Sequence, residues 1–398
     1  MSDISVGRAR AAVSSLFFLN GVVVATWIPY IPSVKRHHDI GDGQLGLTLF
    51  AFTLGGVLGL PLAGWLVGRR GSRNVAVAGA LGLCLMLPGP VFAPHAFLVA
   101  VALVVFGVFN GALDVSMNAQ AVEVERRHGR AIMSSFHALY SFGGLAGSGL
   151  AGLTMFAEVP PVVHVGLVSL AMAASVLVAW PFLVVSAPSP TGMERVFARP
   201  PRHLVALGLI ALCGLLAEGA MADWTAVYLR DVLATSSGTA ALGFAAFSLA
   251  MAAGRFAGDM LTRRWGPVRV LRTSSVVASV GLALALLLHD ARAAMIGFAA
   301  VGIGIANIVP LVFSAAGRAP GLPPSTAIAA VASLGYFGWL AGPPVIGLAA
   351  EALGLPSALG LVSAACAFVA IRASFVREPT REPRSSASLL QKIETTWK

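Results

Sequence analysis

The chain contains few charged residues. Asp, Glu, Lys and Arg make up 11% of its 398 residues, whereas 57% of the residues are hydrophobic. A soluble domain of ordinary size carries more charge and cannot bury this much apolar surface in its core. The composition therefore excludes a soluble globular enzyme and indicates a polytopic membrane protein that uses lipid as its solvent.

Sequence signatures of catalysis and of bound cofactors are also missing. Each of the three cysteines, Cys84, Cys213 and Cys366, lies in an apolar run without a partner at metal-ligand spacing. The eight His residues are scattered, and no phosphate-binding Gly-Lys-Ser/Thr loop or Ser-His-acid set is suggested by spacing. We predict that the protein is not an enzyme, takes no cofactor and no metal, and does not pump with ATP.

The formal net charge of +10 is compatible with nucleic-acid binding when taken alone. The basic residues, however, form short clusters between apolar runs rather than one continuous patch. We therefore expect no nucleic-acid partner. The expected partners are the lipid bilayer, a small-molecule solute and protons, and the chain is expected to act as a monomer.

Apolar runs long enough to cross the bilayer core, about 20 residues each, occur twelve times. Six lie near 12–34, 44–67, 74–92, 96–121, 131–156 and 161–185, and six near 203–229, 239–262, 270–288, 293–317, 325–350 and 356–376. We predict an all-α membrane protein of twelve transmembrane helices in two pseudo-symmetric six-helix bundles. The bundles are assigned to 1–186 and 203–376, with a cytoplasmic linker at 187–202 and a cytoplasmic tail at 377–398 whose composition is typical of disorder.

Charge in the connecting loops predicts the orientation. If both termini are inside, most basic clusters fall inside as well, and the basic residues left outside are Lys35, Arg36, Arg230 and Arg292. The opposite orientation would violate the positive-inside rule. We predict a multi-pass protein of the bacterial inner membrane with both termini cytoplasmic.

The two halves also resemble each other. The run FTLGGVLGLPLAGWLVGRRGSR at Phe52–Arg73 is similar to FSLAMAAGRFAGDMLTRRWGPVR at Phe247–Arg269, about 195 residues later. Both runs join a helix rich in small residues to a basic turn. Parallel six-helix halves with a binding site between them are typical of two-bundle secondary transporters.

The first basic turn resembles the signature of the major facilitator superfamily, in which glycine, an acid, Arg, Gly and Arg follow at fixed spacing. Gly64, Arg69, Gly71 and Arg73 match, whereas Gly68 stands where the family usually has Asp. The resemblance therefore does not extend to the family's usual charge-relay latch between the second and eleventh helices.

The runs GALDVSMNAQAVEVE, SSFHALYSFGGLAG, AEGAMADWTAVYLRD, GIGIANIVP and GPPVIGLAAE are similar to the bacterial MosC-like branch, which includes YbjJ-type proteins. This resemblance implies a twelve-helix secondary transporter and assigns no substrate.

Two acidic residues deep in apolar runs are candidates for proton coupling. Asp114 shares one helix face with Asn110 and Asn118 at a spacing of four. Glu218 lies near the middle of the seventh run. A charged carboxylate at that depth is costly, so each acid is protonated, is paired with a cation or faces a wet cavity. The alternative for Asp114 is a fixed hydrogen-bond acceptor between helices, and for Glu218 a neutral structural carboxyl.

Further polar and aromatic residues are weaker candidates. His137 is a candidate proton relay, with packing as the alternative. We expect Asp223 to be solvated at the cavity mouth. The residues that we expect in a substrate cavity, each with plain packing as its alternative, are Asn20, Trp27, Asn110, Asn118, Tyr140, Ser141, Trp224 and Asn307.

A third group of residues is expected at inner gates. Arg255 and Asp259, four residues apart near the inner end of the eighth run, are predicted to pair with each other and to exchange partners during switching, with a static pair as the alternative. Glu123 is interpreted first as part of a solvated face and second as a gating residue. Arg69 and Arg73 are gating candidates in the basic turn.

Together these patterns predict a secondary active transporter of a small polar organic solute, sugar- or cyclitol-like, that is proton-coupled and works by alternating access. One alternative is an exporter of amphipathic compounds on the same fold, against which the polar stripe around Asp114 argues. The other is a membrane sensor that binds ligand without transport, against which the lack of a soluble signalling domain argues.

Overall fold

The computed structural model describes residues 5–129, 132–185, 202–319 and 324–376, and every regular element in them is helical. The first half contains α1 (Val6–Trp27), η1 (Ile28–Tyr30), α2 (Ile31–His37), α3 (Asp42–Arg70), α4 (Ser72–Met86), α5 (Pro88–Phe92), α6 (Ala96–His128), α7 (Met133–Phe156), α8 (Pro161–Ala179) and η2 (Trp180–Phe182). The second half contains α9 (Arg202–Val227), η3 (Tyr228–Val232), α10 (Ser237–Trp265), α11 (Pro267–Leu288), α12 (Ala291–Ile305), α13 (Ile308–Gly317), α14 (Pro324–Leu353), α15 (Leu355–Arg372) and η4 (Ala373–Val376).

The helices are long and apolar enough to span a membrane. Within the described residues, eleven helical stretches meet this description by length and hydropathy. The 24-residue α7 is also of spanning length. Large apolar side chains such as Leu85, Phe97 and Leu287 point outward and are more than 70% exposed, as lipid-facing residues are. The predicted twelve-helix membrane fold is confirmed.

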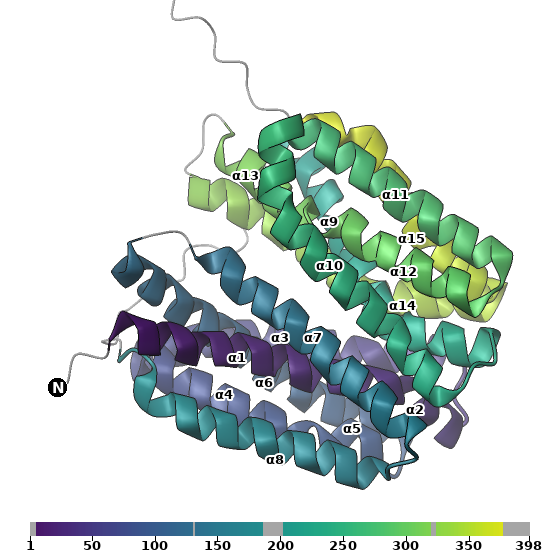
Figure 1. Ribbon diagram of the computed structural model, residues 1–398, viewed down its shortest axis with the longest axis horizontal. Coiled ribbons are helices and arrows are strands. Elements are labelled where there is room, and N and C mark those ends of the chain that lie inside the picture. Colours follow the sequence, from purple (N-terminus) through teal and green to yellow (C-terminus); the bar gives the residue numbers. More distant parts are fainter. Residues whose placement is uncertain (1–4, 130–131, 186–201, 320–323, 377–398) are drawn as a thin grey trace, which may run out of the picture.

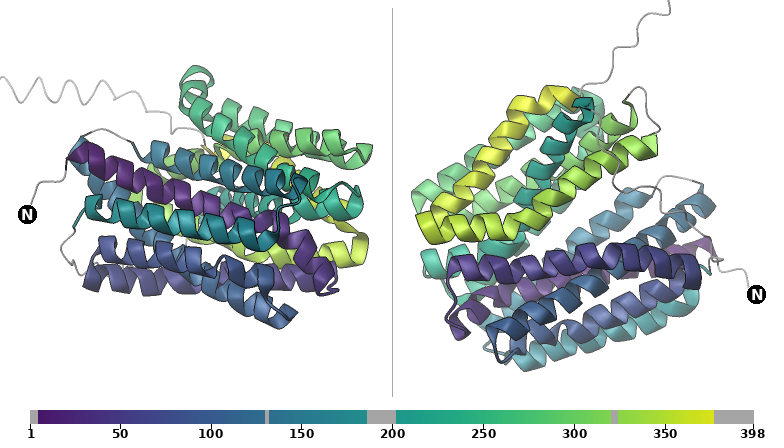
Figure 2. Two further views of the ribbon diagram at one scale, coloured as in Figure 1. Left: turned by 60° about the horizontal axis from the view of Figure 1, so that its bottom comes forward. Right: turned by 180° about the vertical axis from the view of Figure 1, so that it is seen from behind.

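Each half is a bundle, and the two bundles meet along two helix pairs (Figures 1 and 2). In the first half α1 packs on α7 and α3 on α6, and in the second half α9 packs on α14 and α10 on α12. Contacts between the halves run mainly through α3 with α14 and through α7 with α10. The bundles lie close together at the end that carries α2, called here the α2 end, and diverge toward the end that carries the N-terminus, called here the N-terminal end.

Two pairs of glycines show how closely the halves repeat each other. A Cβ at Gly107 of α6 would lie 2.0 Å from the carbonyl oxygen of Phe52 in α3. A Cβ at Gly302 of α12 would lie 2.3 Å from the carbonyl oxygen of Phe247 in α10. No real Cβ is accommodated at such a distance, so both helix crossings require glycine, as close transmembrane contacts commonly do.

The basic turns repeat as well. Gly71 ends α3 with φ 78°, and Gly266 ends α10 with φ 79°, a conformation that favours glycine. In each half the next helix starts at the following residue. The similarity between the two sequence runs therefore reflects the same helix–turn–helix geometry.

The predicted linker and tail, 187–202 and 377–398, lie outside the described residues except for Arg202, where α9 begins.

Candidate functional site: a central cavity between the halves

Two adjoining pockets lie between the bundles and together form a central cavity with volumes of ≈ 90 and ≈ 220 Å³. The first, called here the Asp223 pocket, is lined by Trp27, Ser141, Asp223, Phe244, Phe247 and Ser248 among others. The second, called here the Asp114 pocket, is lined by Asn20, Asp114, Met117, His137 and Tyr336 among others. Asn110, Tyr140, Glu218, Arg255 and Trp339 line both. Helices of both halves thus contribute polar groups to one space suited to a small solute.

An ion pair in the cavity links three helices. The guanidinium of Arg255 on α10 lies with Nη2 3.4 Å from Oε1 of Glu218 on α9. Its Nη1 donates to the hydroxyl oxygen of Ser141 on α7 at 2.9 Å, across the boundary between the halves. The side chains of Arg255 and Glu218 are 24% and 23% exposed. The pair is therefore partly desolvated but remains open to a ligand or a proton.

This arrangement corrects the predicted position of Arg255. The sequence placed it at an inner gate with Asp259, whose side chain lies outside the described residues. The structure places Arg255 in the central cavity with Glu218, because the face of α10 that carries it points toward α9 and α7. Burial explains the pair with Glu218, since a charge inside a cavity requires a counter-charge there.

Asp114 of α6 faces the cavity from the first half. Its Oδ1 accepts a hydrogen bond from Nδ2 of Asn118 at 3.1 Å, and its carbonyl oxygen accepts from the same amide at 2.8 Å. Asn118 does not appear among the lining residues of either pocket. Its expected place in the cavity is therefore corrected: it orients the Asp114 carboxylate from one turn away on the same helix.

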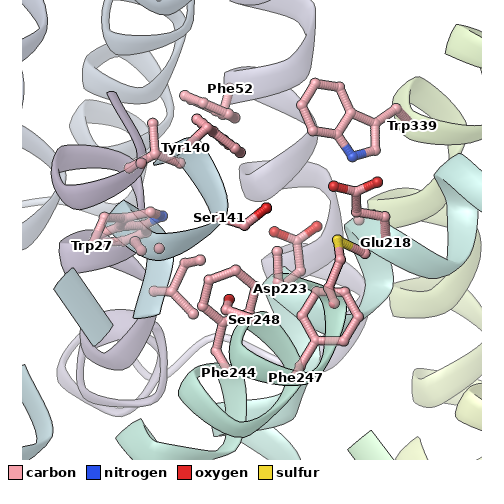
Figure 3. A pocket seen from close by; sticks show the side chains of 18 of the residues that line it. Trp27, Phe52, Tyr140, Ser141, Glu218, Asp223, Phe244, Phe247, Ser248 and Trp339 are labelled. Atoms are coloured by element: carbon pink, nitrogen blue, oxygen red, sulfur yellow. The ribbon is translucent and has the colours of Figure 1, made fainter. Parts of the chain in front are cut away.

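Most other cavity candidates are brought together as expected. Asn20, Trp27, Asn110, Tyr140 and Ser141 line the pockets. Figure 3 shows the Ser141 hydroxyl and the carboxylates of Glu218 and Asp223 pointing into the same space, with aromatic rings around them. His137 lines the Asp114 pocket, and its ring meets Phe17 edge-on at a centroid distance of 5.2 Å.

Two cavity candidates are wrong in position. Trp224 is completely buried in the packed helices of the second half and does not line the cavity. Asn307, 8% exposed, donates from Nδ2 to the carbonyl oxygen of Gly254 at 3.0 Å and holds the α12–α13 break against α10. In both cases the polar side chain faces a neighbouring helix, which residue type alone does not reveal.

The gating candidates at the N-terminal end make local contacts. The guanidinium carbon of Arg69 lies 4.5 Å from the ring centre of Trp65 on its own helix. Glu123 binds Arg126 and Arg127, three and four residues further along α6, both at 2.8 Å. Nε of Arg73 has no hydrogen-bond partner in the described part of the chain. None of these contacts joins the two halves.

Charges at the α2 end do join the halves, and sequence reasoning missed them. Nζ of Lys35 lies 2.6 Å from Asp42 and 3.0 Å from Asp231, and Nη1 of Arg36 lies 3.0 Å from Asp231. Beside them, the backbone N–H of Gly43 at the start of α3 donates to Oε2 of Glu351 at 3.0 Å. We call Lys35, Arg36, Asp42, Asp231 and Glu351 the α2-end latch.

Next to the latch, α3 and α14 touch each other through their backbones. A Cβ at Gly46 of α3 would lie 2.5 Å from the carbonyl oxygen of Pro343 and 2.9 Å from Cα of Gly347, both in α14. A signal for the latch exists in the sequence, because Lys35–Arg36 and Arg230–Asp231 occupy equivalent places in the two halves.

Two helical bundles that enclose a polar cavity within an apolar exterior are typical of membrane transporters. A family model described as the Major Facilitator Superfamily matches residues 13–322 and 207–398. The chain belongs to this superfamily.

Relatives place it in the MosC-like branch. An uncharacterised MFS-type transporter of Yersinia pestis is 36% identical over 347 residues, covering 87% of this chain and 90% of that protein. The membrane protein MosC of Rhizobium meliloti is 33% identical over 367 residues, covering 92% and 89%. The crystal structure of the nucleoside transporter NupG has the same fold, with a TM-score of 0.70 at 14% identity over 93% of this chain and 100% of that one.

Proposed function

We propose that this protein is a proton-coupled secondary transporter that moves a small polar organic solute, sugar- or cyclitol-like, by alternating access. The observation that carries the proposal is the Glu218–Arg255 ion pair in the central cavity, together with the bond from Arg255 to Ser141 in the other half. A titratable pair at the meeting point of two bundles joins proton binding to their relative position.

The coupling follows from the charges. Protonation of Glu218 removes the counter-charge of Arg255 and leaves Ser141 as its remaining partner. The neutral carboxyl no longer balances Arg255, so the released guanidinium needs a new partner, which the solute or another acid of the cavity supplies before the site closes. Asp114, held by Asn118, supplies a second carboxylate that a proton neutralises in the same cavity.

The closed end suggests the state of the transport cycle. If both termini are cytoplasmic in the bacterial inner membrane, the α2-end latch closes the outer side and the bundles diverge toward the cytoplasm. Breaking the latch while closing the N-terminal end would expose the same cavity to the outside, which is the exchange that alternating access requires. A single chain contains the whole cavity, which is consistent with a monomer.

The cavity chemistry favours a polar solute over an amphipathic one. Charged, amide and hydroxyl groups line it beside the aromatic rings. NupG, which shares the fold, is named as a transporter of nucleosides, which are hydroxylated solutes. Protection of growing cells against dye-like toxins, without flux of polar solutes, would favour the amphipathic exporter instead.

The test is solute flux in proteoliposomes under an imposed pH gradient. The solute is first chosen by a thermal-shift screen of the purified protein against sugars, cyclitols, amino acids and organic acids, since ligands stabilise the folded state. Glu218→Gln and Asp114→Asn are measured beside wild type, with the exposed Glu158→Gln as the matched control.

We expect at least one cavity variant to lose its response to the gradient, whereas the control keeps it. An unchanged response in both cavity variants contradicts proton coupling at these residues. Solute binding without any flux contradicts transport itself and favours a sensor.

A further inference from the structure

Several hydrogen-bond acceptors of the central cavity have no partner among the described residues. Asp223 of α9 points into the Asp223 pocket (Figure 3) and has no hydrogen-bond or ion-pair partner in the described residues. The buried side-chain oxygens of Asn20 and Asn110, which also line the cavity, have no partner there either. Donor groups of a ligand that enters the cavity can pair with these acceptors.

The strongest donor in the cavity is already engaged. Arg255 directs one nitrogen to Glu218 and another to Ser141. Among the charged residues that line the two pockets, the acids are Asp114, Glu218 and Asp223, and the permanent cation is Arg255. After the Glu218–Arg255 pair is formed, two carboxyl groups and no unpaired cation remain in this lining, so an anionic solute finds no cationic partner there.

The surroundings of Asp223 suit an organic cation. The same pocket is walled by Trp27, Phe244, Phe247 and Trp339, whose ring faces attract an ammonium group. No group of three His, Cys, Asp or Glu able to hold a metal ion occurs among the residues that the structure describes. The aromatic walls and the lack of converging ligands favour an amine over a metal cation.

We propose that the transported solute is an amine-bearing polyol, a molecule of the sugar or cyclitol type that carries one protonated amino group, and that Asp223 binds this ammonium. The inference rests on the proposed transport function and specifies its substrate class. Ser248 and the two asparagines bind the hydroxyl groups, while the rings of Phe244 and Phe247 cover the apolar face of the solute.

The test compares matched ligands on the full chain in lipid nanodiscs. Amino sugars, aminocyclitols and linear aminopolyols are each measured beside the neutral parent in which hydroxyl replaces the amine, and beside the corresponding uronic acids. Binding is measured by thermal shift and by titration at a fixed pH and ionic strength, for wild type, Asp223→Asn and Asp223→Glu. The control is Asp39→Asn, an exposed loop residue with φ 51° that Asn also adopts.

We expect at least one amine to bind about tenfold or more tightly than its neutral parent, as one charge-assisted hydrogen bond provides. Asp223→Asn should lose this preference, Asp223→Glu should keep part of it, and Asp39→Asn should keep all of it. If Asp223→Asn does not fold, the ratio of amine to parent binding in wild type and in Asp223→Glu still decides.

Three results overturn the inference: a neutral parent or a uronic acid that binds as well as the amine, an undiminished amine preference in Asp223→Asn, or no binding by any amine. Flux measurements distinguish a failure of the amine-recognition inference from a failure of the proposed transport function. Gradient-driven flux of a neutral polyol refutes amine recognition and leaves transport standing. Amine binding without flux of any solute refutes transport and leaves the recognition standing.

Discussion

In the first half Gly107 lies against the carbonyl of Phe52, and in the second half Gly302 lies in the same way against Phe247, each residue 195 positions after its counterpart. The turn glycines Gly71 and Gly266 are separated by the same number. The residues of the cavity do not repeat. Counting back 195 positions from Glu218, Asp223 and Arg255 gives Val23, Ile28 and Leu60.

The polar cavity residues of the first half have no polar counterparts in the second half either. The positions that correspond to Asn110 and Asp114 are Ile305 and Val309. Duplicated packing therefore builds a symmetric frame, whereas each half supplies its own polar groups. The comparison teaches that helix contacts in this fold tolerate little change, because backbone meets backbone, and that lining positions change freely between halves.

The largest effect is expected where the frame repeats. Gly107→Ala and Gly302→Ala should each destabilise the protein by about 1–3 kcal/mol, because the added Cβ collides with a carbonyl oxygen and the helices must separate. Apparent melting temperature in detergent and yield of monodisperse protein measure this. Gly149→Ala, where a Cβ meets nothing within 4 Å, is the control. A marked loss at one position and none at the other would break the equivalence of the halves.

The next effect tests the asymmetry of the cavity. Arg255→Leu should lower solute flux about tenfold or more, because it leaves Glu218 without its counter-charge. Leu60→Met, a volume-conserving change at the equivalent position of the first half, should keep most of the flux. Arg255→Lys should give an intermediate rate, since it keeps the charge but loses the second donor that reaches Ser141. Equal rates for Arg255→Leu and wild type would exclude a role for the pair.

A smaller effect is expected at the α2-end latch, where the first half supplies the cations and the second half Asp231. Asp231→Asn should shift the population toward an open α2 end by about 1 kcal/mol, because the ion pairs are partly exposed. Spin labels at Asp39 and Ser237, in a background without the three cysteines, report the distance between the halves.

The exchange of Lys35→Asp with Asp231→Lys should restore part of the closed population. High salt should weaken the wild-type latch in the same direction as Asp231→Asn. A label distance that neither the variant nor salt changes would show that the latch contributes nothing to closure.

The smallest effect is expected at Glu123. Its partners Arg126 and Arg127 lie on the same exposed helix end, and neither of these two ion pairs joins the halves. Glu123→Gln should therefore leave flux and melting temperature within measurement error. A clear loss of flux would make Glu123 a gating residue in a state other than this one.

Much of the fold could be predicted from the sequence, because the length and apolarity of the hydrophobic runs depend on the bilayer rather than on tertiary detail. The acids Asp114 and Glu218 could be placed for the same reason, since a carboxylate at that depth needs a cavity or a cation. The prediction succeeded where the cost of misplacing a group is largest.

The partners of these groups could not be predicted. Spacing along one helix suggested Asp259 as a partner of Arg255 and did not reveal Glu218, which the structure pairs with Arg255 from another helix. Asp223 and Trp224 are adjacent in the sequence, and yet Trp224 is buried among helices while Asp223 lines the cavity. A single sequence does not reveal the rotation of a helix about its axis when its hydrophobicity is nearly uniform.

The contact between Gly46 and Gly347 involves almost no side chains, so the two helices can roll on each other there without repacking rotamers. α3 contains 29 residues and is thus about 43 Å long. If α3 tilts by about 10° about a point near one end, its other end moves by about 7 Å. The glycine pair is therefore suited to act as a pivot. A small movement of α3 at this end of the membrane opens a wide gap between the helices at the other end.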